Sequence, residues 1–135
     1  MLDENSSLED VRVFFANDRF ATDACGCEVL EAAHGHSACA FTIGPQHINA
    51  QGNVMGGAIF TLADFALAVA CNVGEKPTVS VQSSIEYFNM AKGARLIATA
   101  EADKSGRNLG FYTVDIADDL GTHVARMTAT CFRRA

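Results

Sequence analysis

The stretch of sequence that decides the fold is Asn53–Cys71, NVMGGAIFTLADFALAVAC. From Gly56 onward it consists almost wholly of small and apolar residues, and Asp64 is its only charge. One set of apolar side chains recurs at the period of a helix: Ile59, Leu62, Ala63, Ala66, Leu67 and Ala70. The opposite side, with Phe60, Ala68 and Cys71, is apolar too, and a helix that is apolar all round is a buried one. The stretch therefore predicts a long buried helix over roughly residues 57–73, with a single carboxylate inside it.

The segments before this helix predict one short helix and two strands. A helix over about residues 7–17 is predicted by SSLEDVRVFFAND, in which Ser7 is the cap and Asp10 takes the capping-box position. The apolar face of that helix consists of Val11, Phe14 and Phe15. Two strands around a turn near His34-Gly35 are predicted by DACGCEVLEAAHGHSACAFTIG. A loop follows in GPQHINAQGNVMG.

Beyond the central helix the sequence predicts four strands. They lie in TVSVQSSIEYF, ARLIATAEAD, LGFYTVDIAD and HVARMTATCFR. The first of them alternates, and one of its faces consists of Val79, Val81, Ile85 and Tyr87. Short connections between consecutive strands favour an antiparallel meander. The order of elements predicts an α+β fold, a single domain over residues 1–135 in which one antiparallel sheet wraps around the central helix.

The composition limits the class of protein. The 135 residues fit one domain, and the net charge of −6 argues against a general nucleic-acid binder, which usually has a basic face. The apolar run FALAVAC is too short to span a membrane, and the acidic start MLDENSSLED is unlike an export signal. The five cysteines are expected to be reduced thiols. We therefore expect a cytoplasmic protein with no nucleic-acid or membrane partner.

The segment HINAQGNVMGGAIFTLADFALAVACN resembles the signature of hotdog-fold thioesterases of the phenylacetyl-CoA type. The matching positions are Asn49, Gly52, Met55-Gly56-Gly57 and Leu62-Ala63-Asp64. The resemblance includes the Gly106-Arg107 turn and the last four strands, and it covers roughly residues 20–133. One position departs from the family, because its usual His before the Gly pair is Met55 here. The resemblance implies a hotdog fold, an acyl-CoA thioesterase without a cofactor, and a homodimer that assembles into a homotetramer.

The carboxylate inside the helix needs an explanation, because burial of an unpaired charge costs several kcal/mol. Asp64 either pairs with an Arg or caps a neighbouring loop, or it serves a reaction, which the resemblance favours. Gly56-Gly57 begins the helix, where free N–H groups and the helix dipole favour a developing negative charge. The glycine pair is thus a candidate oxyanion hole, and it also suits a tight turn from loop to helix.

The spacing separates these two candidate groups. Asp64 lies seven residues beyond Gly57, which is about 10 Å along the helix axis. It should therefore not reach a carbonyl held at the start of its own helix. A second helix from another subunit could supply the matching carboxylate, and the family that the chain resembles has its active sites between two subunits. We expect two equivalent sites per dimer.

The expected reaction is hydrolysis of an acyl-CoA thioester. The N–H of Gly56, with or without that of Gly57, polarises the thioester carbonyl. Asp64 of the partner subunit either activates a water molecule or attacks as a nucleophile, and the sequence leaves both roles open. Burial should raise the pKa of Asp64 and make it a better base.

Four further positions have a functional and a plain interpretation. Asn49 matches the family's Asn near the reacting carbonyl, or it only forms the turn before Gly52. Ser80 matches a polar position that assists the water in some relatives, or it is an ordinary strand Ser. Arg107 either contacts a phosphate of the CoA nucleotide or is a solvated hairpin residue. Met55 cannot hold a proton as His does and is expected to line the acyl pocket, which leaves a non-catalytic acyl-CoA-binding protein as the alternative.

Two thiols and two imidazoles flank one predicted turn: Cys25, Cys27, His34 and His36. They could form the zinc site of a redox or sensor module. Their spacing matches no common zinc module, so we expect no metal. Of the remaining histidines, His47 lies in the loop before Asn49 and either approaches the site or, as we expect, lies at the surface. His123 is expected to face solvent.

Overall fold

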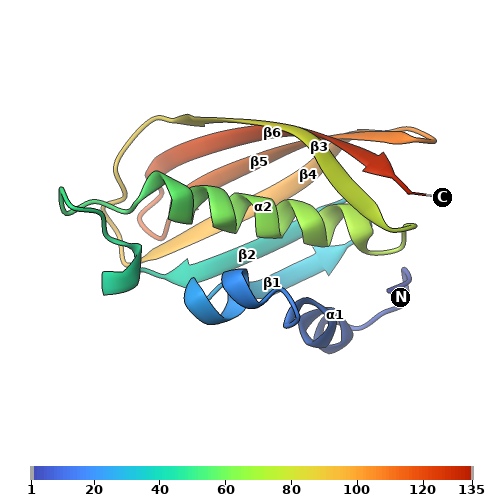
Figure 1. The fold of residues 1–135 in the computed structure, drawn as a ribbon, viewed down its shortest axis with the longest axis horizontal. Helices are drawn as coiled ribbons and strands as arrows, with labels where there is room; N and C mark the ends of the chain where they lie inside the picture. Colours follow the sequence, from blue (N-terminus) through green and yellow to red (C-terminus); the bar gives the residue numbers. More distant parts are fainter. Residues whose placement is uncertain (1, 135) are drawn as a thin grey trace.

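One six-stranded antiparallel sheet curls around one long helix (Figure 1). The computed structural model describes residues 2–134. Its helices are α1 (Leu8–Phe15) and α2 (Gly56–Asn72), with a π-helical turn at Phe20–Ala24 and a 3₁₀ turn at Pro45–His47. Its strands are β1 (Glu28–Ala33), β2 (His36–Thr42), β3 (Thr78–Tyr87), β4 (Arg95–Ser105), β5 (Leu109–Asp118) and β6 (His123–Arg133). This is the α+β architecture that the sequence predicts, with the sheet wrapped around the central helix.

The central helix α2 lies along the concave face of the sheet (Figure 1) and covers residues 56–72 where 57–73 were predicted. The side toward the sheet is fully buried, as at Leu62 and Ala66. The stripe formed by Phe60, Asp64 and Ala68 is only half-buried or exposed, because little of the chain packs over it. The prediction of a helix buried on all sides is therefore wrong for the single chain. Within residues 2–134, no helix has both the length and the apolar character needed to cross a membrane.

The strand order in the sheet is β1-β2-β4-β5-β6-β3. The predicted meander is present in β4, β5 and β6, but it is wrong for β3, which pairs with β6 at the edge of the sheet. β4 pairs with β2 instead, from His36↔Glu101 to Thr42↔Arg95. The chain therefore crosses from one edge of the sheet to its middle between β3 and β4. The sequence gives no sign of this crossing, because residues 88–94 have the length of an ordinary loop.

The edge strand β3 contains one residue more than the segment of β6 beside it. Ser80 pairs with Cys131, and Gln82 pairs with Thr130, the residue of β6 directly before Cys131. Val81 is thus left without a partner, which makes a β-bulge. Because successive paired residues point to opposite faces, Ser80 and Gln82 lie on opposite faces of the sheet.

The bulge changes which side chains of β3 face the helix. Ser80 shares a face with Ile85 and Tyr87, and their partners on β6, such as Cys131, are buried under α2. Val79 points to the other face and is exposed. The predicted common face of Val79, Val81, Ile85 and Tyr87 is therefore wrong, since simple alternation cannot pass through a bulge.

The N-terminal helix α1 has the predicted capping box. Ser7 Oγ accepts the Asp10 N–H at 3.1 Å, and Asp10 Oδ2 accepts the Ser7 N–H at 3.0 Å. Val11 and Phe15 are buried as predicted, but Phe14 is 47% exposed and does not belong to the apolar face. The helix ends at Phe15 rather than near residue 17, and the π-helical turn that follows approaches α2.

The hairpin of β1 and β2 carries an imidazole between two carboxylates. His36 Nδ1 lies 2.6 Å from Glu101 Oε1, and His36 Nε2 lies 2.8 Å from Glu31 Oε1. Both ring nitrogens can donate to these acceptors only in the charged imidazolium. The hydrogen bond to Glu31 is the main cause that raises the pKa of His36, and Glu101 adds to it.

This arrangement predicts a pH-dependent contribution to stability. The folded-state pKa lies above the unfolded one, so the contribution is complete below the unfolded pKa and is lost as pH rises through the folded pKa. We expect His36→Asn to lower the free energy of unfolding by roughly 0.2–1 kcal/mol at about pH 5 and by less at about pH 8. Urea titrations of both proteins at the two pH values measure this. An equal loss at both values would contradict the assignment.

Candidate active site

The opening of α2 presents free backbone N–H groups. Met55 is the N-cap residue with an extended backbone, and no side chain caps this helix within the described residues. The first hydrogen bonds of the turn run from the N–H groups of Ala58 and Ile59 to the Met55 carbonyl. The N–H groups of Gly56 and Gly57 precede them, so they point outward from the helix without an intrahelical acceptor. The helix dipole adds positive character at this point.

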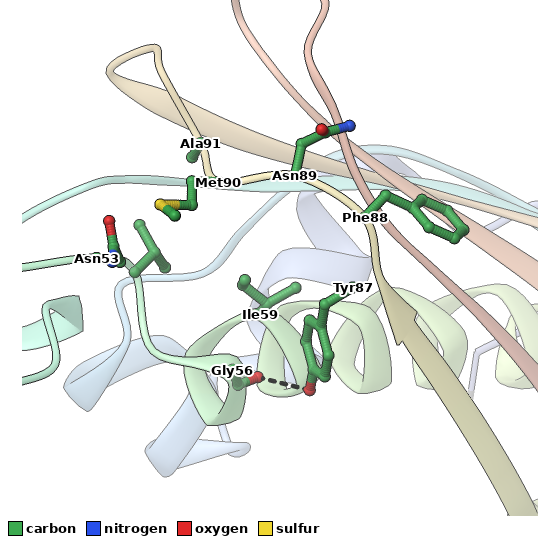
Figure 2. A pocket seen from close by; sticks show the side chains of 9 residues that line it. Asn53, Gly56, Ile59, Tyr87, Phe88, Asn89, Met90 and Ala91 are labelled. Carbon is green, nitrogen blue, oxygen red and sulfur yellow. Dashed lines mark hydrogen bonds between the residues drawn. The ribbon is translucent and has the colours of Figure 1, made fainter. Parts of the chain in front are cut away.

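A hollow of about 520 Å³ lies beside this helix opening (Figure 2). It is bounded by the loop that enters α2 and by the segment that leaves β3: Asn53, Val54, Gly56, Ile59, Tyr87, Phe88, Asn89, Met90 and Ala91. Figure 2 shows the Tyr87 hydroxyl donating to the Gly56 carbonyl, at 3.0 Å. The hollow combines an apolar lining with two side-chain amides and the start of a helix, which suits an apolar group that ends in a carbonyl.

Asp64 lies farther along α2, in a second hollow of about 430 Å³. Its neighbours there include the rings of Phe20, Phe60 and Phe65. Within residues 2–134 no hydrogen bond or ion pair engages the Asp64 carboxylate, so neither an Arg partner nor a capped loop accounts for it.

The environment of Asp64 differs from the predicted one. The sequence predicts a buried carboxylate, whereas Asp64 is exposed in the single chain because the outer side of α2 is open. Its pKa is nevertheless raised, first by desolvation and then by the negative charge of Asp18. The two findings agree if the neighbouring rings exclude water from the sides of the carboxylate while its outer side stays open.

Ser80 and Asp64 come together although they lie on different elements. The bulge in β3 turns Ser80 toward α2, and both residues line a third hollow of about 230 Å³. Gly56 does not line either of the hollows that contain Asp64. In a single chain the glycine pair, with the hollow beside Gly56, is thus separate from Asp64 and Ser80.

Asn49 shapes the loop that leads into α2. Its Oδ1 accepts the N–H of Gln51 at 3.0 Å and the N–H of Asn53 at 3.1 Å, while its own N–H donates to the Asn53 carbonyl. These bonds fit the turn-forming interpretation of Asn49. Asn49 does not line the hollow beside Gly56.

Arg107 is exposed in the turn between β4 and β5. A different residue holds that turn, the buried Arg133. Its guanidinium donates to the Gly106 carbonyl at 2.6 Å, to Ser105 Oγ and to Glu75. Arg107 is thus presented to solvent on a fixed turn, where a phosphate could approach it.

His47 was predicted at the surface, and this prediction is wrong. The residue is only 2% exposed, and its ring stacks on Phe41. Nδ1 accepts the Gly44 N–H, so Nε2 donates to the Cys25 carbonyl at 2.7 Å, and the imidazole is neutral. The His47 carbonyl in turn accepts the Met55 N–H at 2.7 Å. No spacing pattern marks this role in the sequence, because the partners are backbone groups from two separate segments.

The four residues of the alternative zinc site do not form a cluster. Cys25 and Cys27 precede β1 and are buried in the core, whereas His34 and His36 lie beyond its other end. A strand of six residues spans about 20 Å. His34 contacts Glu75, and no group of three or more metal-ligating side chains occurs in residues 2–134. His123 contacts Asp115 at the sheet surface, as expected for a solvent-facing residue.

The chain is similar to known proteins over most of its length. A model of the Thioesterase superfamily matches residues 51–125. A putative esterase of Deinococcus radiodurans is 31% identical over 114 residues, which cover 83% of this chain and 77% of that protein. The acyl-coenzyme A thioesterase PaaI of Escherichia coli is 29% identical over 122 residues, which cover 90% of this chain and 86% of that protein.

Solved structures share the fold. The E. coli PaaI protein from the phenylacetic acid degradation operon superposes with a TM-score of 0.80 and 26% identity, over 96% of this chain and 97% of that one. A hypothetical thioesterase of Streptococcus pneumoniae, solved with coenzyme A, superposes with a TM-score of 0.80 and 27% identity, over 90% of this chain and 99% of that one. The segment that the family model matches contains Gly56, Asp64, Ser80 and Arg107 but not Asn49.

Proposed function

Because the chain belongs to the Thioesterase superfamily and has its hotdog fold, we propose that it hydrolyses an acyl-CoA thioester to the free acid and coenzyme A. The observation that carries this proposal is the opening of α2, where Gly56 borders an apolar hollow and the N–H groups of Gly56 and Gly57 have no acceptor within the helix. The acyl-CoA class is supported by the E. coli relative named an acyl-coenzyme A thioesterase and by the S. pneumoniae structure with coenzyme A.

The proposed working unit is a homodimer in which the subunits share each site. Two incomplete surfaces of the chain support it: the open stripe of α2 around Asp64 and the unpaired edge of β3, where Val81 is 60% exposed. An unpaired edge offers N–H and C=O groups to a second strand. Twofold pairing brings the same patch of both subunits together, so that Asp64 of the partner subunit faces Gly56 and Gly57. Two such dimers form the homotetramer that the family resemblance implies.

The chemistry then follows from the glycine pair of one subunit and Asp64 of the other. The N–H groups of Gly56 and Gly57 bind the thioester oxygen and stabilise the negative charge that develops on it. Asp64 of the partner subunit takes a proton from a water molecule, whose oxygen forms a bond to the carbonyl carbon. The carbon–sulfur bond then breaks, and the proton passes to the leaving thiolate of coenzyme A. The raised pKa of Asp64 suits a base that takes a proton from water.

The remaining residues take supporting roles in this proposal. Ser80, which lines a hollow with Asp64, orients the water through its hydroxyl. Asn49 holds the loop before Gly56, and Arg107 contacts a phosphate of the nucleotide. Met55 is 53% exposed beside Gly57 and does not line the hollow beside Gly56, so any apolar contact it makes with the substrate lies outside that hollow.

The pKa of Asp64 predicts how the rate depends on pH. Since the base must be deprotonated, kcat/KM falls as pH drops through the pKa of Asp64. Because that pKa is raised, this acidic fall in kcat/KM occurs above the pH range of an ordinary aspartate. Asp18→Asn removes a negative charge that raises this pKa, so the acidic fall in kcat/KM moves to lower pH. Rate profiles of both proteins measure the shift. Asp23→Asn serves as the control, because that carboxylate pairs with Arg19. If kcat/KM of Asp18→Asn falls at the same pH as that of the wild type, the charge of Asp18 does not raise the pKa of Asp64.

The proposed function is tested by the release of coenzyme A from a panel of acyl-CoA thioesters, followed with a thiol reagent. The wild-type protein should release coenzyme A from at least one of them and should sediment as a dimer or tetramer. If no thioester is cleaved but a thioether analogue raises the melting temperature, the protein binds acyl-CoA without catalysis. A monomer at the assay concentration would contradict the shared site.

A further inference from the structure

Given the thioesterase activity proposed above, on which this step rests, we infer that Tyr87 is a positioning residue for the oxyanion hole. Its hydroxyl donates to the carbonyl of Gly56 at 3.0 Å (Figure 2). That carbonyl and the N–H of Gly57 belong to one planar peptide unit, so a bond to the first fixes the direction of the second. Tyr87 thereby aims the Gly57 N–H at the substrate carbonyl without touching the reacting atoms.

The contact between Tyr87 and Gly56 depends on the absence of a side chain at residue 56. A Cβ at Gly56 would lie 3.3 Å from both Cζ and the hydroxyl oxygen of Tyr87, which is tighter than ordinary contact. The ring therefore rests directly on the first residue of α2 (Figure 2). This close approach gives Gly56 a second reason to be glycine, besides room for the substrate.

The first turn of α2 already holds this peptide unit, and the Thr61 hydroxyl donates to the Gly57 carbonyl at 2.8 Å. The hydrogen bond from Tyr87 adds a restraint at a point where the chain is unusually free. Two consecutive glycines open the helix, and glycine has the most conformational freedom of any residue. The N-cap residue Met55 makes no side-chain hydrogen bond to the first turn. Tyr87 adds a restraint from outside the helix, and its hydrogen bond also polarises the peptide, which strengthens the Gly57 N–H as a donor.

The support for Tyr87 is a regular part of the sheet. Tyr87 pairs with Ala125, and the next residue, Phe88, donates its N–H to the Val124 carbonyl at 2.8 Å. The bulge farther back in β3 gives Tyr87 its orientation toward α2. Desolvation raises the pKa of Tyr87 above the ordinary tyrosine value, so the phenol stays protonated and remains a donor throughout the usual assay range.

The test is Tyr87→Phe, which keeps the ring and removes only the hydroxyl. We expect kcat to fall roughly twofold to tenfold, as the loss of one neutral hydrogen bond predicts. KM should stay constant, because the interaction strengthens as charge develops on the oxygen. Tyr112→Phe makes the same chemical change at the only other tyrosine, on β5, and should leave kcat unchanged. Tyr87→Phe with unchanged kcat would overturn the inference.

A second measurement reads the hydrogen bond without turnover. In an Asp64→Asn background, infrared spectra of a bound acyl-CoA with an isotope-labelled carbonyl report how strongly the oxygen is polarised. Adding Tyr87→Phe should move the carbonyl band toward its position in water, and an unmoved band would refute the positioning role. If Asp64→Asn still hydrolyses the thioester, the proposed mechanism fails instead, whatever Tyr87 does.

Discussion

Asp64→Asn lowers kcat for thioester hydrolysis by about a hundredfold to ten-thousandfold, as expected when a general base is removed. The amide keeps the shape of the side chain but can neither accept a proton from water nor attack the carbonyl. The affinity for a thioether analogue of acyl-CoA should remain, since the glycine N–H groups and the hollow beside them are untouched. Steady-state kinetics and calorimetric titration measure the two quantities.

The stability of the same variant separates a reactive carboxylate from a structural one. Asp64 has no hydrogen-bond or ion-pair partner within residues 2–134, and its raised pKa means that folding disfavours its charged form. A carboxylate of this kind opposes folding above its pKa, so the substitution should preserve or increase the free energy of unfolding at neutral pH. A variant that unfolds more easily would point to a structural role, and one that keeps full activity would contradict the mechanism. Asp23→Asn, on an exposed pair with Arg19, should match the wild type.

Mixing two inactive variants restores activity if the subunits share each site. Gly56→Pro removes one N–H at the first helical position, and the extended backbone of Met55 suits a following proline. Its Cβ also presses on Tyr87, so the variant disturbs the start of α2 as well as removing the donor. Asp64→Asn removes the base. In a heterodimer of the two variants, one site contains both substitutions and the other site contains neither. Equal amounts, exchanged at random, should regain about a quarter of the wild-type rate.

The readout is the rate of coenzyme A release before and after the two proteins are unfolded together and refolded. Each variant refolded alone provides the control, and its thermal melting curve shows whether it folds. If the mixture stays as inactive as its components although both fold and associate, Asp64 acts within its own subunit or does not act at all.

The fold could be predicted from the sequence where local patterns decide it. The period of apolar residues after Gly56 predicted α2 to within one residue at each end, and Ser7 with Asp10 predicted the start of α1. The place of β3 could not be predicted, because pairing with β6 rather than β4 depends on contacts between distant segments. The bulge at Val81 was missed as well, since it breaks the alternation on which strand prediction rests.

The candidate site divides in the same way. The glycine pair and Asp64 are conspicuous in the sequence because both break an apolar run. His47 and Tyr87 are not, because each acts through a backbone carbonyl or N–H that no side-chain pattern reveals. The sequence also predicted Asp64 as buried, whereas the outer side of α2 is open in the single chain. Hydrophobicity alone does not tell which apolar side of a helix the chain itself covers.

The unpaired Val81 also determines where this strand can change length during evolution. Deleting Val81 would leave Ser80 opposite Cys131 and Gln82 opposite Thr130, so every other side chain of the strand would keep its direction. Deleting a residue between Gln82 and Tyr87 would invert one part of the strand relative to the other. Homologous sequences should therefore carry single-residue gaps at Val81, and rarely at the positions after it.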